Sequence, residues 1–285
     1  MTAWLSFIKE RLPLASYALI VGGFVMTAKA VMQTPWTWKL LIPFVGLLFF
    51  FIELRLMDEL KDYSKDVVAH PQRPLPRGLV SVAAMKKVVN AGLIVMWAFA
   101  GLSFLLNGAS AITYALIVLY LYLMYKEFFV GESLANKPFL YACTHQIIIV
   151  LLLVYAAASL NPEAIHSDLA YLAGFVILGC FFTYEVARKM DPKAHPILKT
   201  YLSVYGRKGV AVILIFLQLV SWIAAILMKE QVVLFGLIAG SALLLLSWFA
   251  FMTNEAKFKL VETAGTLCLL ISLYVIPLSL WLTRG

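Results

Sequence analysis

The chain is a succession of long apolar runs separated by short polar segments. Runs of roughly 18 or more apolar residues are long enough to cross a bilayer as helices. The pattern predicts nine such helices, centred on residues 14–32, 39–57, 82–104, 109–125, 138–159, 167–187, 208–228, 232–252 and 261–282. The sequence therefore predicts an all-α, polytopic membrane protein with about nine transmembrane helices around a central cavity.

Composition supports this membrane assignment. Of the 285 residues, 63% are hydrophobic and 13% are charged, whereas a soluble domain is about half apolar and a quarter charged. The net charge of +8 has a simple cause in a membrane protein, because lysine and arginine collect in cytoplasmic loops. We therefore expect the lipid bilayer as a partner and no nucleic acid.

The basic residues are distributed unequally over the two sides of the predicted membrane. Four of the 23 lysines and arginines fall on one side, namely Lys29, Lys39, Lys229 and Arg284. The positive-inside rule then predicts that the N-terminus is cytoplasmic. The two longest polar segments, 58–80 and 188–207, lie on that same side. We expect them to cap the active site of a single helical domain, residues 1–285.

The first of these segments carries four carboxylates within nine residues. If the second helix continues past the membrane surface, Asp58, Asp62 and Asp66 recur at every fourth position on one face, with Glu59 on its flank. Stacked carboxylates repel one another unless a cation lies among them, and such oxygen ligands suit Mg²⁺ shared with substrate phosphates. The alternative is a solvated acidic helix end whose surface pairs involve Lys61 and Lys65.

A pair of arginines braced by prolines follows the acidic cluster. In "RPLPRG", residues 73–78, the prolines stiffen a non-helical segment that holds Arg73 and Arg77 in place. Guanidinium groups bind phosphate oxygens in a bidentate manner. Carboxylates, a divalent cation and fixed arginines together predict a diphosphate site.

Both motifs resemble the first signature of the UbiA superfamily of intramembrane prenyltransferases, N-D-x-x-D-x-x-x-D followed by R-P-L-P-S-G. The spacing here is the same, with Asp58 in place of Asn, Glu59 in place of Asp and Arg77 in place of Ser. The nine helices and the motifs after helices two and six are also similar to that family over the whole chain. The resemblance implies a UbiA-like fold and an isoprenoid diphosphate as substrate.

The resemblance also implies roles for individual residues. It implies Mg²⁺ held by Asp58, Glu59, Asp62 and Asp66. Asp58, Asp62, Asp66 and Lys126 then form the expected catalytic set. The diphosphate is expected to contact Arg73, Arg77 and Lys126, the last at the end of the fourth helix.

The second polar segment departs from the family pattern. Where the family has D-x-x-x-D, this chain has "YEVARKMD", residues 184–191. Arg188 and Lys189 can pair internally with Glu185, or they can contact the diphosphate and replace part of a second metal's charge. We favour the second hypothesis. The substrate-binding set expected from this segment is Tyr184, Glu185, Arg188, Lys189 and Asp191.

Three further polar residues are weaker candidates. His145 lies in a predicted span, where polar residues usually face the bundle interior, and a structural role is favoured for it. Glu127 and Glu132 lie either at the mouth of the site or at the surface, and the sequence favours neither position.

The pattern as a whole predicts an Mg²⁺-dependent prenyltransferase that moves an isoprenoid chain from its diphosphate to an unknown acceptor. One alternative is a terpene cyclase of the same superfamily, which ionises the same diphosphate without an acceptor. The other is a non-enzymatic transporter or lipid-binding membrane protein. Transporters tend to place broken helices at mid-membrane, whereas the charges of this chain lie at the helix ends.

Overall fold

The computed structural model describes residues 3–134 and 137–284, and the regular structure in these ranges is helical. The α-helices are α1 Ala3–Arg11, α2 Leu14–Val31, α3 Leu41–Lys61, α4 Tyr63–Ala69, α5 Val82–Ser103, α6 Gly108–Tyr125, α7 Gly131–Leu134, α8 Pro138–Gln146, α9 Ile148–Ala158, α10 Asp168–Arg188, α11 Tyr201–Met228, α12 Gln231–Thr253 and α13 Phe258–Arg284. Short 3-10 turns are η1 Trp38–Leu40, η2 Glu127–Phe129, η3 Pro162–His166, η4 Pro196–Leu198 and η5 Glu255–Lys257.

Within those two ranges, nine helical stretches are long and apolar enough to cross a membrane. This confirms the predicted all-α, multi-pass architecture. Several starts follow from local capping: the Ser81 side chain accepts from Ala84 N, and the Asn107 side chain accepts from Ser110 N. Such caps satisfy backbone donors that a helix leaves unpaired.

Two boundaries differ from those predicted. The fifth span is divided at Ile147 into α8 and α9. A short helical stretch precedes the seventh span: it begins at Tyr201, where the Thr200 side chain caps it by accepting from Ser203 N. Gly206, with a φ of 63°, forms a non-helical kink in α11, a conformation that glycine adopts without strain. The long apolar part of the helix follows this kink, near residue 208 as predicted. The irregular part of the predicted cap segment 188–207 is therefore shorter than expected.

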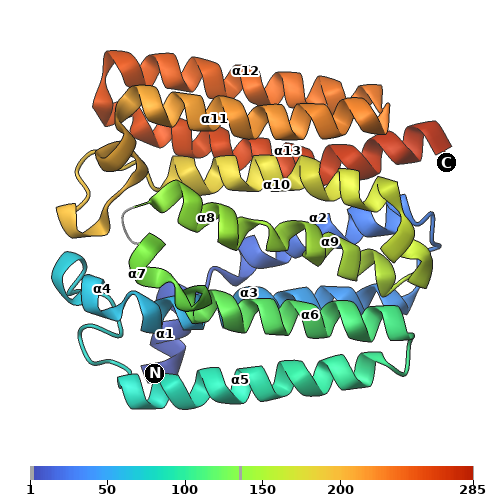
Figure 1. Cartoon of the computed structure of the whole chain (residues 1–285), viewed down its shortest axis with the longest axis horizontal. Coiled ribbons are helices and arrows are strands. Elements are labelled where there is room, and N and C mark those ends of the chain that lie inside the picture. The colour runs from blue at the N-terminus through green and yellow to red at the C-terminus, as the bar shows by residue number, and fades with distance from the viewer. Residues whose placement is uncertain (1–2, 135–136, 285) are drawn as a thin grey trace.

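The spans lie side by side, with α5 at one edge of the bundle and α12 at the opposite edge (Figure 1). The most buried element is α9, all of whose residues except Leu151 are buried, and it packs against α10, α2 and α6. Helix α13 packs against α12, α10 and α2. The bundle is thus built around α9, α10 and α2.

One end of the bundle gathers most of the features that the sequence singled out. Helices α1, α4 and α7 and the segment that follows α10 all lie there (Figure 1). We call this the polar end. The 3-10 turn η4 packs on α4, so the two predicted cap segments meet. The N-terminal and C-terminal ends of the drawn chain lie at opposite ends of the bundle, as an odd number of spans requires.

Candidate active site at the polar end

Helix α3 continues beyond its apolar run to Lys61, and α4 follows almost in line. Asp62 N donates to Asp58 O at 2.9 Å, and Asp66 N donates to Asp62 O at 2.9 Å. These hydrogen bonds keep the three aspartates at helical spacing, although α3 ends at Lys61 and α4 begins at Tyr63. The predicted spacing is therefore present in the structure.

Register alone does not bring all four acids together. An α-helix turns by about 100° per residue, so each four-residue step drifts by about 40° around the axis. Glu59 and Asp66, seven residues apart, are therefore nearly aligned, whereas Asp58 lies well to one side of both. The structure accordingly divides the acids into two pairs, Glu59 with Asp66 and Asp58 with Asp62.

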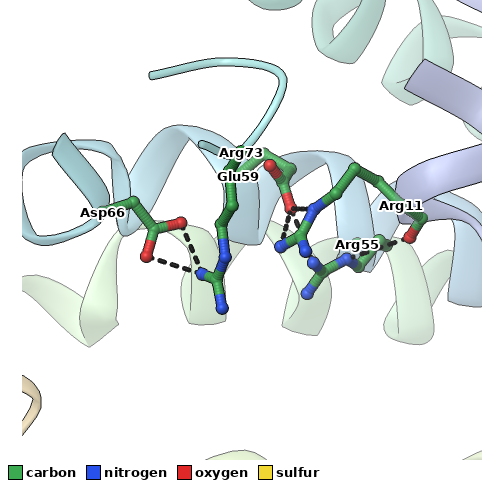
Figure 2. Close-up of polar contacts among 5 residues, drawn as sticks. All are labelled: Arg11, Arg55, Glu59, Asp66 and Arg73. Atoms are coloured by element: carbon green, nitrogen blue, oxygen red, sulfur yellow. Dashed lines mark hydrogen bonds and ion pairs between the residues drawn. The ribbon is translucent and has the colours of Figure 1, made fainter. Parts of the chain in front are cut away.

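Glu59 is held by two arginines from different helices. Figure 2 shows the guanidinium groups of Arg11 and Arg55 converging on its Oε1. Arg11 donates to it from Nε at 2.8 Å and from Nη2 at 2.6 Å, and Arg55 Nη2 lies 2.6 Å away. The Glu59 side chain is 1% exposed. Burial lowers the pKa of Arg11, and the hydrogen bond to Glu59 opposes this shift. Glu59 therefore fastens α1 to α3.

Asp66 and the "RPLPRG" segment hold each other. Arg73 Nη1 donates to both carboxylate oxygens of Asp66, at 2.6 and 2.7 Å (Figure 2). Arg77 reaches the other way, to Glu10 of α1 at 2.7 Å, and also donates to the carbonyl of Gln72. The stiff segment thus positions Arg73 beside the acids, as the sequence predicts, and ties Arg77 to α1.

Asp58 forms an ion pair with a lysine, and lysine charges act on Asp62. Lys61 Nζ lies 3.2 Å from Asp58 Oδ1. Burial raises the pKa of Asp62, and the charge of Asp58 raises it further. The charges of Lys61, Lys189 and Lys65 act in the opposite direction. Asp58 and Asp62 therefore form a close pair of repelling carboxylates, which we call the acid pair.

The acid pair fits a Mg²⁺ ion, because this ion commonly uses one or two carboxylates and takes its other ligands from phosphate and water. Nowhere in the described part of the chain do three Asp, Glu, His or Cys side chains converge as a metal cage. Glu59 and Asp66, also expected as ligands, pair with arginines. The buried Glu59 Oε2 has no hydrogen-bond partner, and the role of both acids as ligands stays a prediction. The expected ligands outside these arginine pairs are Asp58 and Asp62, which we take as the first candidates to hold the metal.

The second segment ends α10 with local ion pairs. Glu185 lies 2.7 Å from Arg188 Nη2 and 2.6 Å from Lys189 Nζ. The Arg188 and Lys189 side chains are 42% and 52% exposed, so both remain accessible to a ligand. Asp191 accepts from Lys193 N in the following turn. Because the charge of Lys189 acts on Asp62, the basic end of α10 faces the acid pair.

An aromatic wall extends from the polar end into the bundle. Tyr17 stacks on Phe51 at 5.9 Å, Phe51 on Phe181 at 6.3 Å, and Phe181 meets the edge of Tyr184 at 6.1 Å. These rings come from α2, α3 and α10. Tyr17 lies within electrostatic reach of Asp58 and Arg188, so the wall adjoins the acid pair. The central cavity stays a prediction, since these rings occupy the interior between the three helices.

Lys126, expected beside the diphosphate, is directed to two tyrosine rings of its own helix end rather than to the acid pair. Its ammonium lies over the rings of Tyr122 and Tyr125, 5.6 and 5.3 Å from their centres. The lysine in contact with Asp58 is Lys61, for which a surface role was expected only under the alternative of a solvated helix end. Arg11 and Arg55 were also missed. The pairing of Arg55 with Glu59 could have been predicted from their four-residue spacing in a helix. The pairing of Arg11 with Glu59 could not, because these residues are 48 positions apart.

Comparison with known proteins assigns the chain to a family. The model of the UbiA prenyltransferase family matches residues 16–259. A solved structure of a digeranylgeranylglyceryl phosphate synthase in membranes has a TM-score of 0.68 and 15% identity, covering 98% of this chain and 99% of its own. The apo structure of a UbiA homolog from Aeropyrum pernix K1 has a TM-score of 0.64 and 15% identity, covering 95% and 98%. No curated protein sequence matches the chain. The chain belongs to the UbiA prenyltransferase family, multi-pass membrane proteins that transfer prenyl groups.

Proposed function

We propose that the protein transfers an isoprenoid chain from its diphosphate to an acceptor at the polar end of the bundle. The observation that carries the proposal is the acid pair. It lies on the same helical register as Asp66, which Arg73 holds, and within electrostatic reach of Lys189 at the end of α10. Members of the family are typically Mg²⁺-dependent and use isoprenoid diphosphates. The proposed orientation has the N-terminus and this end in the cytoplasm, where most basic residues collect.

The chain's own residues suit binding and ionisation of an allylic diphosphate. Asp58 and Asp62 would hold Mg²⁺, which as a Lewis acid draws charge onto the departing diphosphate. Arg73 uses only Nη1 on Asp66, so its remaining nitrogens can donate to phosphate oxygens. Arg188 and Lys189 are placed to compensate charge from the side of α10. In the reaction, the allylic C–O bond breaks with its electron pair on the diphosphate, and the acceptor forms the new bond and loses a proton.

The altered second segment supports a site with a single metal. Glu185 is occupied by two cations, and a second dication beside these positive charges would be repelled. Arg188 and Lys189 would therefore compensate the charge of the diphosphate by hydrogen bonds and ion pairs. This is the role expected of a second metal ion in the family's D-x-x-x-D pattern. The aromatic wall complements this arrangement, because ring faces attract cations and exclude water from the developing carbocation.

The deciding experiment incubates the purified protein with Mg²⁺ and labelled prenyl diphosphates of several lengths, with and without a membrane extract. The proposal predicts prenylated products only when the extract supplies an acceptor. Cyclic hydrocarbons or alcohols without the extract would instead identify a cyclase. Consumption of none of the diphosphates under either condition would refute the proposal. Glu163→Gln, at an exposed acid far along the chain from both motifs, serves as a matched control for Asp62→Asn.

A further inference from the structure

Lys61 is a partly buried cation that the proposed function has not used. It is the last residue of α3, and its side chain is 16% exposed. Its ammonium lies 3.2 Å from Asp58 Oδ1, and its charge also acts on Asp62. A buried ammonium is costly unless it is paired, so Lys61 is bound to the acid pair whenever nothing else compensates its charge.

The ammonium is held from the other side by Tyr141 of α8. The Lys61 Nζ atom lies 5.6 Å from the centre of the Tyr141 ring, within the range of a cation–π contact. The same ring stacks on His145 with centroids 4.1 Å apart. The Tyr141 hydroxyl donates to Glu127 Oε1 at 3.4 Å. Tyr141 is therefore fixed both at its face and at its hydroxyl.

An unusual turn completes this support. Glu127, Phe128 and Phe129 have φ values of 51°, 53° and 60°, a left-handed conformation that costs non-glycine residues about 1–2 kcal/mol each. It packs the Phe128 ring against His145 at 5.6 Å. A Cβ at Gly131 would clash with Glu127 Oε2 in its present position. Strain of this kind is found where surrounding structure fixes a functional geometry.

The charges explain what a fixed Lys61 does. The acid pair carries two negative charges, and Lys61 compensates one of them. A Mg²⁺ ion between Asp58 and Asp62 would meet this ammonium at short range, where like charges repel strongly in a poorly hydrated site. A diphosphate reverses the balance, since its negative oxygens attract both the metal and the ammonium.

We propose that Lys61 is a resident counter-ion of the acid pair and a positioning residue for the diphosphate. It keeps Mg²⁺ from binding to the free protein, and it turns its ammonium to the phosphate oxygens when the substrate arrives with the metal. Metal binding thereby depends on the diphosphate. This inference rests on the proposed function, because it assumes that the acid pair holds the metal.

The test measures metal binding rather than turnover. Mn²⁺ is titrated into the purified protein and followed by electron paramagnetic resonance, with and without inorganic pyrophosphate. The wild type is expected to bind Mn²⁺ weakly alone and much more tightly with pyrophosphate. Removing the ammonium in Lys61→Met is expected to tighten Mn²⁺ binding to the free protein on the order of tenfold or more, and to reduce the gain from pyrophosphate.

Two variants serve as controls. Lys61→Arg keeps the charge and should behave as the wild type does without pyrophosphate. Lys65→Met removes an exposed lysine one turn further along, whose charge also acts on Asp62. Because solvent screens this charge, the change in both affinities should be much smaller than in Lys61→Met. If Lys61→Met does not fold, Lys61→Gln gives the same comparison with a polar side chain of similar length.

The outcomes distinguish a failure of the proposed role of Lys61 from a failure of the proposed function. Equal Mn²⁺ affinities of the free wild type and Lys61→Met overturn the counter-ion role, while recruitment of Mn²⁺ by pyrophosphate would still support the acid pair. If no protein binds Mn²⁺ even with pyrophosphate, the metal site fails, and the inference fails with it. A site tightened as much in Lys65→Met as in Lys61→Met would indicate a general charge effect and also overturn the specific role.

Discussion

The facing ends of α3 and α10 hold their carboxylates in different ways. At α3, the buried acids Glu59 and Asp66 pair with arginines from α1 and from the proline-rich segment. At α10, Glu185 pairs only with the next turn of its own helix. The first arrangement is fixed by tertiary structure, whereas the second can rearrange side chain by side chain. We infer that α3 supplies a rigid frame for the acid pair and that α10 supplies adjustable positive charge.

The largest effect is expected at the acid pair itself. Asp62→Asn removes one of the two carboxylates proposed to hold Mg²⁺, and the loss of about 4 kcal/mol of transition-state stabilisation corresponds to roughly a 10³-fold lower rate. Diphosphate release from a labelled prenyl diphosphate measures this effect. Asp191→Asn is the matched change at α10, where the acid only accepts from Lys193 N. Comparable losses in the two variants would remove the asymmetry between the helix ends.

A charge reversal at α10 should have the next largest effect. Lys189→Asp places a carboxylate near Asp62 and four residues from Glu185, the family's D-x-x-x-D spacing. Repulsion of the diphosphate should lower the rate roughly 10²-fold, by analogy with disrupted charge pairs. A higher Mg²⁺ requirement should accompany this loss. The rate is measured across a Mg²⁺ titration, and an unchanged rate and Mg²⁺ dependence would show that Lys189 only pairs with Glu185.

The comparison also predicts unequal effects on stability. Glu59→Gln leaves the guanidinium groups of Arg11 and Arg55 without a buried counter-charge, which should lower the free energy of unfolding by about 2–4 kcal/mol. Glu185→Gln should cost less than about 1 kcal/mol, because its basic partners are half exposed and solvent screens them. Thermal unfolding in detergent at neutral pH gives both values. A larger shift for Glu185→Gln would contradict the view of α3 as the rigid frame.

Much of the fold could be predicted because it depends on local pattern. The length of each apolar run determines whether it can span a bilayer, and the nine runs correspond to the nine candidate spans of the described chain. The predicted start of the seventh span near residue 208 agrees with the kink at Gly206. The short helical stretch from Tyr201 to this kink was missed, because the Thr200 cap and not an apolar run begins it.

The site was predictable only as far as it is local. The helical register of Asp58, Asp62 and Asp66 and the position of Arg73 follow from nearby residues. The pairing of Glu59 with Arg11 depends on how α1 docks 48 residues away, which spacing cannot show. Lys61 looked like a surface partner of the acids because its burial depends on Tyr141, a residue of α8.

The smallest effect concerns the metal-free acid pair and its dependence on pH. Burial and the charge of Asp58 raise the pKa of Asp62 above its ordinary value of 3.8, so the folded state binds this proton more tightly than the unfolded state does. The contribution of Asp62 to the free energy of unfolding without metal is therefore fully present below pH 3.8 and is lost as pH rises through the raised pKa. Asp62→Asn lacks this ionisation and should melt at a slightly higher temperature than the wild type at pH 7 without Mg²⁺.

The difference in melting temperature between the wild type and Asp62→Asn should depend on both pH and ligand. Below pH 3.8 the two proteins should melt at similar temperatures, because Asp62 is then neutral in the wild type as well. With Mg²⁺ and pyrophosphate at pH 7, the wild type should become the more stable, since a ligand that binds only the folded state raises its stability. Melting curves over this range, with Asp191→Asn as control, measure both changes. A wild type that is already more stable than Asp62→Asn at pH 7 without metal would show that the carboxylates are compensated within the protein, and that the acid pair has no charge left for a cation.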